Sequence, residues 1–113
     1  TASSTTRKVI LTSSVAAVAD EFERGKTYDE SDWNETSRLD RNPYYYSKVL
    51  AERAAHTYVA ETDQNLQLAV MNPFVVLGPA LNNSINTSVD LYLSMLNGGQ
   101  QGIIDLSWGI VDV

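Results

Sequence analysis

The sequence predicts an α/β fold, a doubly wound parallel sheet of which this chain supplies a part. Two short apolar runs rich in branched residues, Lys8–Thr12 and residues 66–71, have the pattern of buried strands. Between them, residues 44–62 are rich in good helix formers. A β-α-β unit with a right-handed crossover is the most economical interpretation of that order.

The first expected element is the strand at Lys8–Thr12, which the continuous apolar run predicts to be buried on both faces. Ser13 and Ser14 follow at its carboxyl end. Residues 20–43 are then polar and acidic, so they are expected to form a long excursion on the surface. Loops of that length in a compact domain are usually functional.

Pro43 suits the first turn of the helix that follows. The apolar residues Leu50, Ala54 and Val59 recur at helical spacing, which predicts an apolar face turned toward the sheet. The second strand, residues 66–71, is expected to end at Asn72-Pro73.

The remaining sequence predicts one more helix and a strand-like tail. Residues 89–96 have a helical pattern, and the sequence Asn97-Gly98-Gly99 is expected to stop it. Residues 102–113 alternate enough to indicate one or two strands.

The charge of the chain excludes several classes of function. It has 113 residues and a formal net charge of -6, which excludes a basic nucleic-acid binder. All eight basic residues lie at or before Arg53, which argues against a phosphate site built on salt bridges in the second half. No run approaches the roughly 18 apolar residues of a membrane span.

The chain has no cysteine, which excludes disulfides, thiolate catalysis and thiolate metal sites. That composition is compatible with a cytoplasmic protein, which is the expected location. The single histidine, His56, is expected to be a surface or helix-interface residue, so no metal site is expected.

Polar residues gather where ligands bind in parallel α/β sheets, at the carboxyl ends of the strands. Thr12-Ser13-Ser14 and Asn72-Pro73 hold those positions here. Tyr44 and Lys48 open the connecting helix four residues apart, so they should lie one turn above another on a single face.

That spacing suits proton transfer, because a phenol with a pKa of about 10 is a poor acid-base catalyst until a nearby ammonium lowers its pKa. A hydroxyl beside the phenol could bind the same substrate oxygen, and the trio would protonate a carbonyl as hydride arrives at its carbon. The alternative is an ordinary pair on a helix surface, because a Tyr-x-x-x-Lys pair alone is weak evidence.

The motifs together resemble the extended short-chain dehydrogenase/reductases, the NAD-dependent epimerase/dehydratase superfamily, whose dinucleotide-binding domain is Rossmann-like. The resemblance covers essentially the whole chain as a central fragment, a single partial domain over residues 1–113. It is carried by Thr12-Ser13-Ser14 with Tyr44-x-x-x-Lys48, by Asn72-Pro73-x-x-Val76-x-Gly78-Pro79, and by Ile110-Val111-Asp112-Val113.

Within that family the chain is most similar to the dihydroflavonol reductase, cinnamoyl-CoA reductase and methylglyoxal/aldehyde reductase branch, through residues 11–18 and 28–33. Epimerases usually carry Val-Tyr-Gly where this chain has Val18-Ala19-Asp20, which favours a reductase. The resemblance implies NAD(P)H-dependent reduction of an aldehyde or ketone. Alternatives are a sugar-nucleotide epimerase or dehydratase, a hydroxysteroid dehydrogenase, and a non-catalytic dinucleotide-binding domain or inactive fragment.

The resemblance also implies roles for the residues of the proposed triad. Tyr44 would be the general acid, and Lys48 would lower the phenol pKa and bind the nicotinamide ribose. Ser14 would orient the carbonyl oxygen, in preference to Ser13. Val15, together with the loop at residues 82–88, would face the substrate.

The implied cofactor is NADP or NAD, with NADP favoured. Thr12, Ser13, Tyr44 and Lys48 would contact it, and a second segment would line the nicotinamide pocket: Pro73, Phe74, Val75 and Val76. The family's Gly-x-x-Gly-x-x-Gly phosphate loop is absent from the sequence. The N-terminal cofactor half and the C-terminal remainder of the domain are therefore expected to be missing from this chain.

Small residues on the 44–62 helix, Ala51, Ala54 and Ala55, would allow another helix to approach closely. A homodimer through this helix is therefore an expected partner arrangement, beside a small-molecule carbonyl substrate. No nucleic-acid or membrane partner is expected.

Overall fold

The computed structural model describes residues 6–62, 65–79, 84–99, 102 and 107–112. The chain divides into two compact units, Thr1–Asn72 and Pro73–Val113, which are described separately below. Within the described residues, neither helix combines the length and the apolar character that crossing a bilayer requires.

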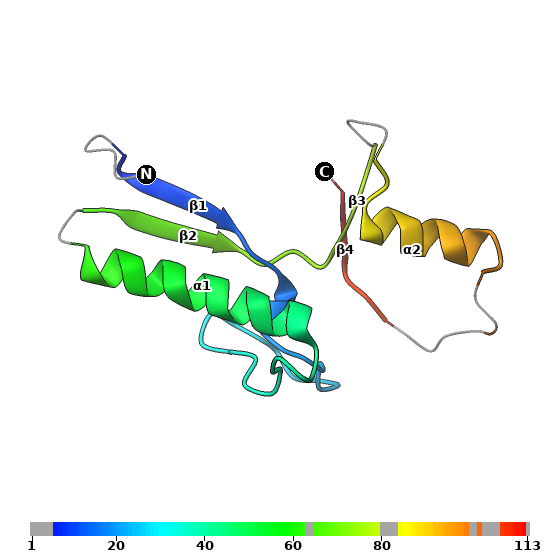
Figure 1. The fold of residues 1–113 in the computed structure, drawn as a ribbon, viewed down its shortest axis with the longest axis horizontal. Coiled ribbons are helices and arrows are strands. Elements are labelled where there is room, and N and C mark those ends of the chain that lie inside the picture. Colours follow the sequence, from blue (N-terminus) through cyan, green and yellow to red (C-terminus); the bar gives the residue numbers. More distant parts are fainter. Residues whose placement is uncertain (1–5, 63–64, 80–83, 100–101, 103–106, 113) are drawn as a thin grey trace. The chain divides into compact units, whose positions relative to one another are not determined.

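The first unit is the predicted β-α-β arrangement (Figure 1). Strands β1 (Lys8–Thr12) and β2 (Gln67–Met71) pair in parallel, in a register that runs from Lys8 opposite Gln67 to Thr12 opposite Met71. The helix α1 (Pro43–Glu61) joins them and packs along one side of the pair. The predicted parallel α/β class is confirmed.

Helix α1 begins at Pro43. The N–H groups of a first helical turn have no partner within the helix, so a proline, which lacks the backbone N–H, fits this position. Asn42 precedes it in a left-handed backbone conformation, with φ 53° and ψ 60°. At the other end, the N–H and the hydroxyl of Thr62 both donate to the carbonyl of Tyr58, at 3.1 and 2.6 Å. The predicted bounds of 44–62 are thus confirmed to within one residue.

The predicted orientation of α1 is wrong. Leu50 is 50% exposed and Ala54 is exposed, whereas Val49 and Glu52 are buried. The helix packs against both β2 and the short turn that follows β1, and these two contacts set which face is covered. The spacing of apolar residues alone therefore did not identify the buried face.

The prediction that β1 is buried on both faces is also wrong for this unit. Ile10 is 67% exposed, and Met71 on β2 is exposed as well. Thr12 pairs with Met71 and lies two residues after Ile10, so these side chains share one face of the sheet. Within the described residues of the first unit, helix α1 lies along one face of the pair, whereas a doubly wound sheet carries helices on both.

The core of the first unit is small and lies at the end of β1. A single 3-10 turn, η1 (Val15–Ala17), follows the strand and packs against α1. Ala16, Ala17 and Ala19 are buried there, together with Val49 from the helix. Small side chains let the turn approach the helix closely, which brings the end of β1 next to α1.

The second unit holds a second parallel pair, β3 (Val75–Leu77) with β4 (Ile110–Asp112), and α2 (Thr87–Leu96) packed on β3. The side chain of Asn86 accepts a hydrogen bond from Val89 N at 2.8 Å, so α2 begins two residues before the predicted start. The tail forms one of the strands predicted for it. Its residues 103–106 and 113 lie outside the described part.

Candidate functional site

The carboxyl ends of β1 and β2 meet at one edge of the first sheet, as the sequence predicts. Ser13 N donates to Met71 O at 2.8 Å, which continues the ladder one residue beyond β1. The side chain of Asn72 donates from Nδ2 to the carbonyl oxygen of Ser14 at 3.0 Å. The residues that follow the two strands are therefore in direct contact.

Ser14 forms the cap of the η1 turn. Its hydroxyl oxygen accepts a hydrogen bond from Ala16 N at 3.2 Å. The hydroxyl proton is not used by that bond, so it can be donated to a ligand oxygen. Ser13, in contrast, is buried and its backbone N–H continues the sheet. The choice of Ser14 as the functional hydroxyl stays a prediction.

Tyr44 and Lys48 lie on consecutive turns at the start of α1. Lys48 Nζ lies 5.5 Å from the centroid of the Tyr44 ring, within the range of a cation–π contact. Tyr44 is 59% exposed, and neither its phenol oxygen nor the Lys48 ammonium forms a hydrogen bond or ion pair within the described residues. Both polar groups are available to a ligand.

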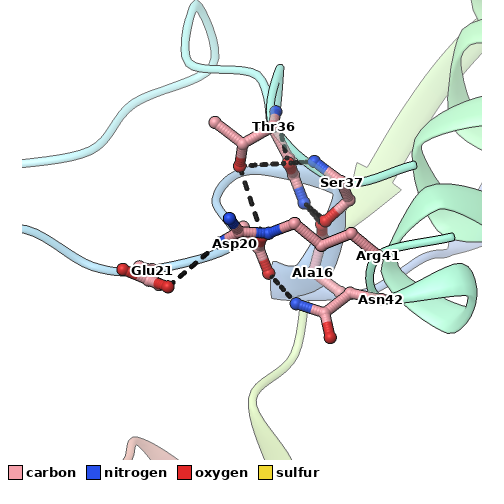
Figure 2. Close-up of polar contacts among 8 residues, drawn as sticks. Ala16, Asp20, Glu21, Thr36, Ser37, Arg41 and Asn42 are labelled. Carbon is pink, nitrogen blue, oxygen red and sulfur yellow. Dashed lines mark hydrogen bonds and ion pairs between the residues drawn. The ribbon is translucent and has the colours of Figure 1, made fainter.

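The start of α1 is tied to the acidic segment by a polar cluster around Asp20 (Figure 2). Asp20 Oδ1 accepts a hydrogen bond from the side chain of Asn42, the residue just before the helix. Its Oδ2 accepts from Arg41 Nε at 3.1 Å and from the Thr36 hydroxyl at 3.3 Å. Arg41 also pairs with Glu21 at 3.0 Å.

The side chain of Asp20 is only 2% exposed. Burial works against its ionisation, but the hydrogen bonds from Asn42 and Arg41 and the charge of Arg41 outweigh burial and hold the pKa of the carboxyl below its usual value of 3.8. The carboxylate is therefore charged at neutral pH and binds the residues that precede α1.

Asn34 anchors the same segment to the η1 turn. Its backbone N–H donates to Ala17 O at 2.9 Å, and its Nδ2 donates to Ala16 O at 2.8 Å and to Ser37 Oγ at 2.9 Å. Its Oδ1 accepts from Ser37 N at 3.0 Å and Thr36 N at 3.1 Å. The excursion lacks helix and strand, as predicted, but Asn34 and Ser37 are buried, so it is not simply a solvated loop.

Sequence reasoning missed Asn34 and Asp20. The only local signal was the sequence Asn34-Glu35-Thr36-Ser37, which is typical of a turn in which the asparagine side chain binds its own backbone. A hollow of about 210 Å³ opens beside this segment, lined by Asp20, Trp33 and Arg41 among others. The residues that line this hollow do not include Ser14, Tyr44 or Lys48.

Comparison with known proteins identifies the family of this chain. The sequence profile described as "NAD dependent epimerase/dehydratase family" matches residues 1–104. The chain belongs to this family. This match confirms the resemblance to the NAD-dependent epimerase/dehydratase superfamily that the sequence motifs indicated.

Among its relatives in this family, Arabidopsis thaliana cinnamoyl-CoA reductase 1 is 34% identical over 95% of this chain and 32% of its own length. Zea mays dihydroflavonol 4-reductase is 33% identical over 83% of this chain and 27% of its own length. The chain therefore spans about a third of the length of these relatives.

A solved structure also matches the fold. The crystal structure of yeast methylglyoxal/isovaleraldehyde reductase complexed with NADPH superposes with a TM-score of 0.77 at 31% identity. The match covers 94% of this chain and 36% of the yeast chain. The predicted Rossmann-like class, present in part, is confirmed.

The family motif Asn72-Pro73-x-x-Val76 continues into the second unit. Val75 and Val76 are half-buried in β3, and Phe74 precedes them. Gly109 approaches Phe74 so closely that a Cβ there would lie 2.8 Å from the ring. The location of Pro73, Phe74, Val75 and Val76 beside a nicotinamide stays a prediction.

The residues expected to face a substrate are described only in part. Val15 opens η1 directly after Ser14 and is half-buried. In the loop at residues 82–88, residues 82 and 83 lie outside the described part of the chain. The substrate-facing role of both segments stays a prediction.

Proposed function

We propose that the protein carrying this chain is an NAD(P)H-dependent oxidoreductase that reduces an aldehyde or ketone to an alcohol. The observation that carries the proposal is the contact between the Lys48 ammonium and the Tyr44 ring on a helix that packs against the turn capped by Ser14. The relatives named above as reductases support the carbonyl substrate class.

In this proposal Tyr44 transfers its phenolic proton to the carbonyl oxygen of the substrate. Its exposed position at the start of α1 leaves the hydroxyl accessible to a ligand. The Lys48 ammonium stabilises the negative charge left on the phenol oxygen. The Ser14 hydroxyl donates a hydrogen bond to the same carbonyl oxygen, keeps its proton, and so fixes the orientation of the substrate.

The cofactor proposed for this site is NADP or NAD, with NADP favoured. When bound in its reduced form, it supplies hydride to the carbonyl carbon, so hydride and the proton from Tyr44 together give the alcohol. The residues present fit such a group, because the Lys48 ammonium, on the helix that packs against the turn after β1, is free of ion pairs within the described residues. Thr12, Ser13 and Lys48 would hold the cofactor there.

The test is Tyr44→Phe in the full-length protein, with aldehyde and flavanone substrates and NADPH. Loss of the proton donor is expected to lower kcat by about 10²- to 10⁴-fold, while the Kd for NADPH stays near that of the parent. Tyr46→Phe is the matched control, because Tyr46 lies on the same helix turn and is half-buried. Retained turnover in Tyr44→Phe would contradict the proposal.

Sugar-nucleotide substrates distinguish the alternative enzymes of the same fold. Conversion of a sugar nucleotide in preference to aldehydes and flavanones would indicate an epimerase or dehydratase. Preferred conversion of a hydroxysteroid would indicate a hydroxysteroid dehydrogenase. Cofactor binding without hydride transfer to any of these substrates would indicate a non-catalytic domain.

A homodimer through α1 is the partner arrangement that the exposed side of this helix supports. Leu50, Ala54 and Tyr58 are spaced by four residues, so they form one exposed stripe along the helix. Light scattering on the full-length protein should give a dimer mass, and Leu50→Glu should shift that mass toward the monomer. An unchanged mass in Leu50→Glu would exclude this surface as the dimer contact.

A further inference from the structure

The side chain of Asn72 bridges two other elements of the first unit. Its Nδ2 donates to the carbonyl oxygen of Ser14 at 3.0 Å and to Glu52 Oε2 at 2.8 Å. Ser14 follows β1, Asn72 follows β2, and Glu52 lies in α1. One amide group therefore joins both strand ends to the helix.

Glu52 is a charged residue in a buried position, only 7% exposed. Burying a carboxylate is costly unless hydrogen bonds stabilise it, and the amide of Asn72 provides such a bond. Glu52 lies four residues after Lys48 and eight after Tyr44, so the three side chains form one stripe along α1. The bridge thus ends on the side of the helix that carries the proposed acid and its ammonium.

We propose that Asn72 and Glu52 are positioning residues that fix the separation between Ser14 and the Tyr44–Lys48 pair. The inference rests on the proposed function, because it assigns the bridge a part in the reaction of that same triad. An asparagine amide suits the task because its NH₂ group donates two hydrogen bonds at once. Aspartate has nearly the same shape, but its ionised form donates none.

A rate effect is expected because Ser14 and Tyr44 must reach the same carbonyl oxygen. A displacement of about 1 Å in such a site can cost about 10²-fold in rate. In the full-length protein, Asn72→Asp removes both donors and places a second carboxylate beside Glu52. We expect kcat to fall about 10- to 100-fold, with the Kd for NADPH changed by less than about threefold.

Two variants of Glu52 separate the hydrogen bond from the charge. Glu52→Gln keeps an acceptor oxygen for Asn72, so its kcat should stay within about threefold of the parent. Glu52→Ala removes the acceptor and should lower kcat in the same sense as Asn72→Asp, which also tests the bridge if Asn72→Asp does not fold. Glu61→Ala, an exposed position at the end of α1, is the matched control and should have no effect.

The decisive measurement is a double-mutant cycle with Ser14→Ala. If Asn72 acts by positioning Ser14, Asn72→Asp should lower kcat far less in the Ser14→Ala background than in the parent. Equal losses in both backgrounds would show a general structural role and overturn the inference. If Tyr44→Phe abolishes turnover while Asn72→Asp leaves kcat unchanged, the positioning role of Asn72 is wrong and the proposed function stands. If Tyr44→Phe retains turnover, the proposed function itself is wrong.

Discussion

Asn42 donates a hydrogen bond from its side chain to the carboxylate of Asp20, across 22 residues of sequence. Asn42 occupies the cap position of α1 in a left-handed conformation, yet its side chain makes no capping bond to the helix. The bond to Asp20 therefore fixes this residue from outside the helix. Tyr44 follows two residues later, so the acidic segment helps to hold the start of α1 in place.

Replacing Asp20 with asparagine should destabilise the first unit in a pH-dependent way. Folding lowers the pKa of the Asp20 carboxyl below its usual value of 3.8. The contribution of this carboxylate to the free energy of unfolding is therefore fully present above pH 3.8, and it is lost as the pH falls through the lower pKa of the folded protein. Asp20→Asn should lower the free energy of unfolding by about 1–2 kcal/mol at pH 7.

The measurement is urea unfolding of Asp20→Asn and its parent between pH 7 and pH 3. The difference between the two proteins should be constant near neutrality and shrink below about pH 4. Asp40→Asn is the control, because Asp40 is exposed and its side chain makes no hydrogen bond within the described residues. A difference that does not vary with pH would show that the charge of Asp20 does not stabilise the fold.

Asn34 should be among the most sensitive positions of the acidic segment. Asn34→Ala removes the donor to Ala16 O and the acceptor for Ser37 N, and it leaves both buried groups without these partners. An unpaired buried polar group costs about 1–3 kcal/mol, so a total loss of about 3 kcal/mol is expected in thermal or urea unfolding.

The exposed Asn65 offers the matched substitution for that experiment. Asn65→Ala should change the free energy of unfolding by less than about 0.5 kcal/mol. Similar, small losses for both variants would mean that Asn34 does not anchor the segment to the η1 turn.

Sequence alone identified those parts of the fold and site that local geometry determines. Strands β1 and β2 were found from their apolar runs. The contact between Tyr44 and Lys48 follows from the helical repeat once Pro43 sets the start of the helix. The meeting of Ser14 with Asn72 follows from the parallel order of the two strands, because their carboxyl ends share one edge.

The remaining features depend on contacts between distant residues, which leave no periodic signal. Asp20 and Asn42 are separated by 22 residues, and neither belongs to an apolar pattern. The buried face of α1 depends on its packing against η1, so Val49 rather than Leu50 is buried. Strand β3 has only three residues, too few for a reliable alternation.

Ser14 is expected to contribute to stability and to catalysis by different atoms. Its oxygen caps η1, so Ser14→Ala should lower the free energy of unfolding by about 1 kcal/mol. Loss of the hydroxyl donor should also lower kcat, by about 10- to 100-fold. Ser14→Thr keeps the hydroxyl and should recover most of both losses. A stability loss with unchanged kcat in Ser14→Ala would leave this serine a structural role only.

Lys48→Met should weaken both cofactor binding and turnover in the full-length protein. The ammonium lies over the Tyr44 ring and forms no ion pair within the described residues, so the proposed function gives it two tasks: binding the cofactor and stabilising the phenolate. The Kd for NADPH should rise about tenfold or more and kcat should fall in addition, because one charged hydrogen bond is worth about 1.5–3 kcal/mol.

Lys26→Met is the matched control for the loss of a cation over an aromatic ring. Lys26 Nζ lies 4.4 Å from the centroid of the Tyr28 ring and pairs with Asp32 at 2.7 Å, in the acidic segment and not in α1. Its substitution removes the same kind of contact and the same charge, so it should leave kcat and the Kd for NADPH unchanged. If both variants weakened cofactor binding equally, the effect would come from net charge, and Lys48 would have no specific contact with the cofactor.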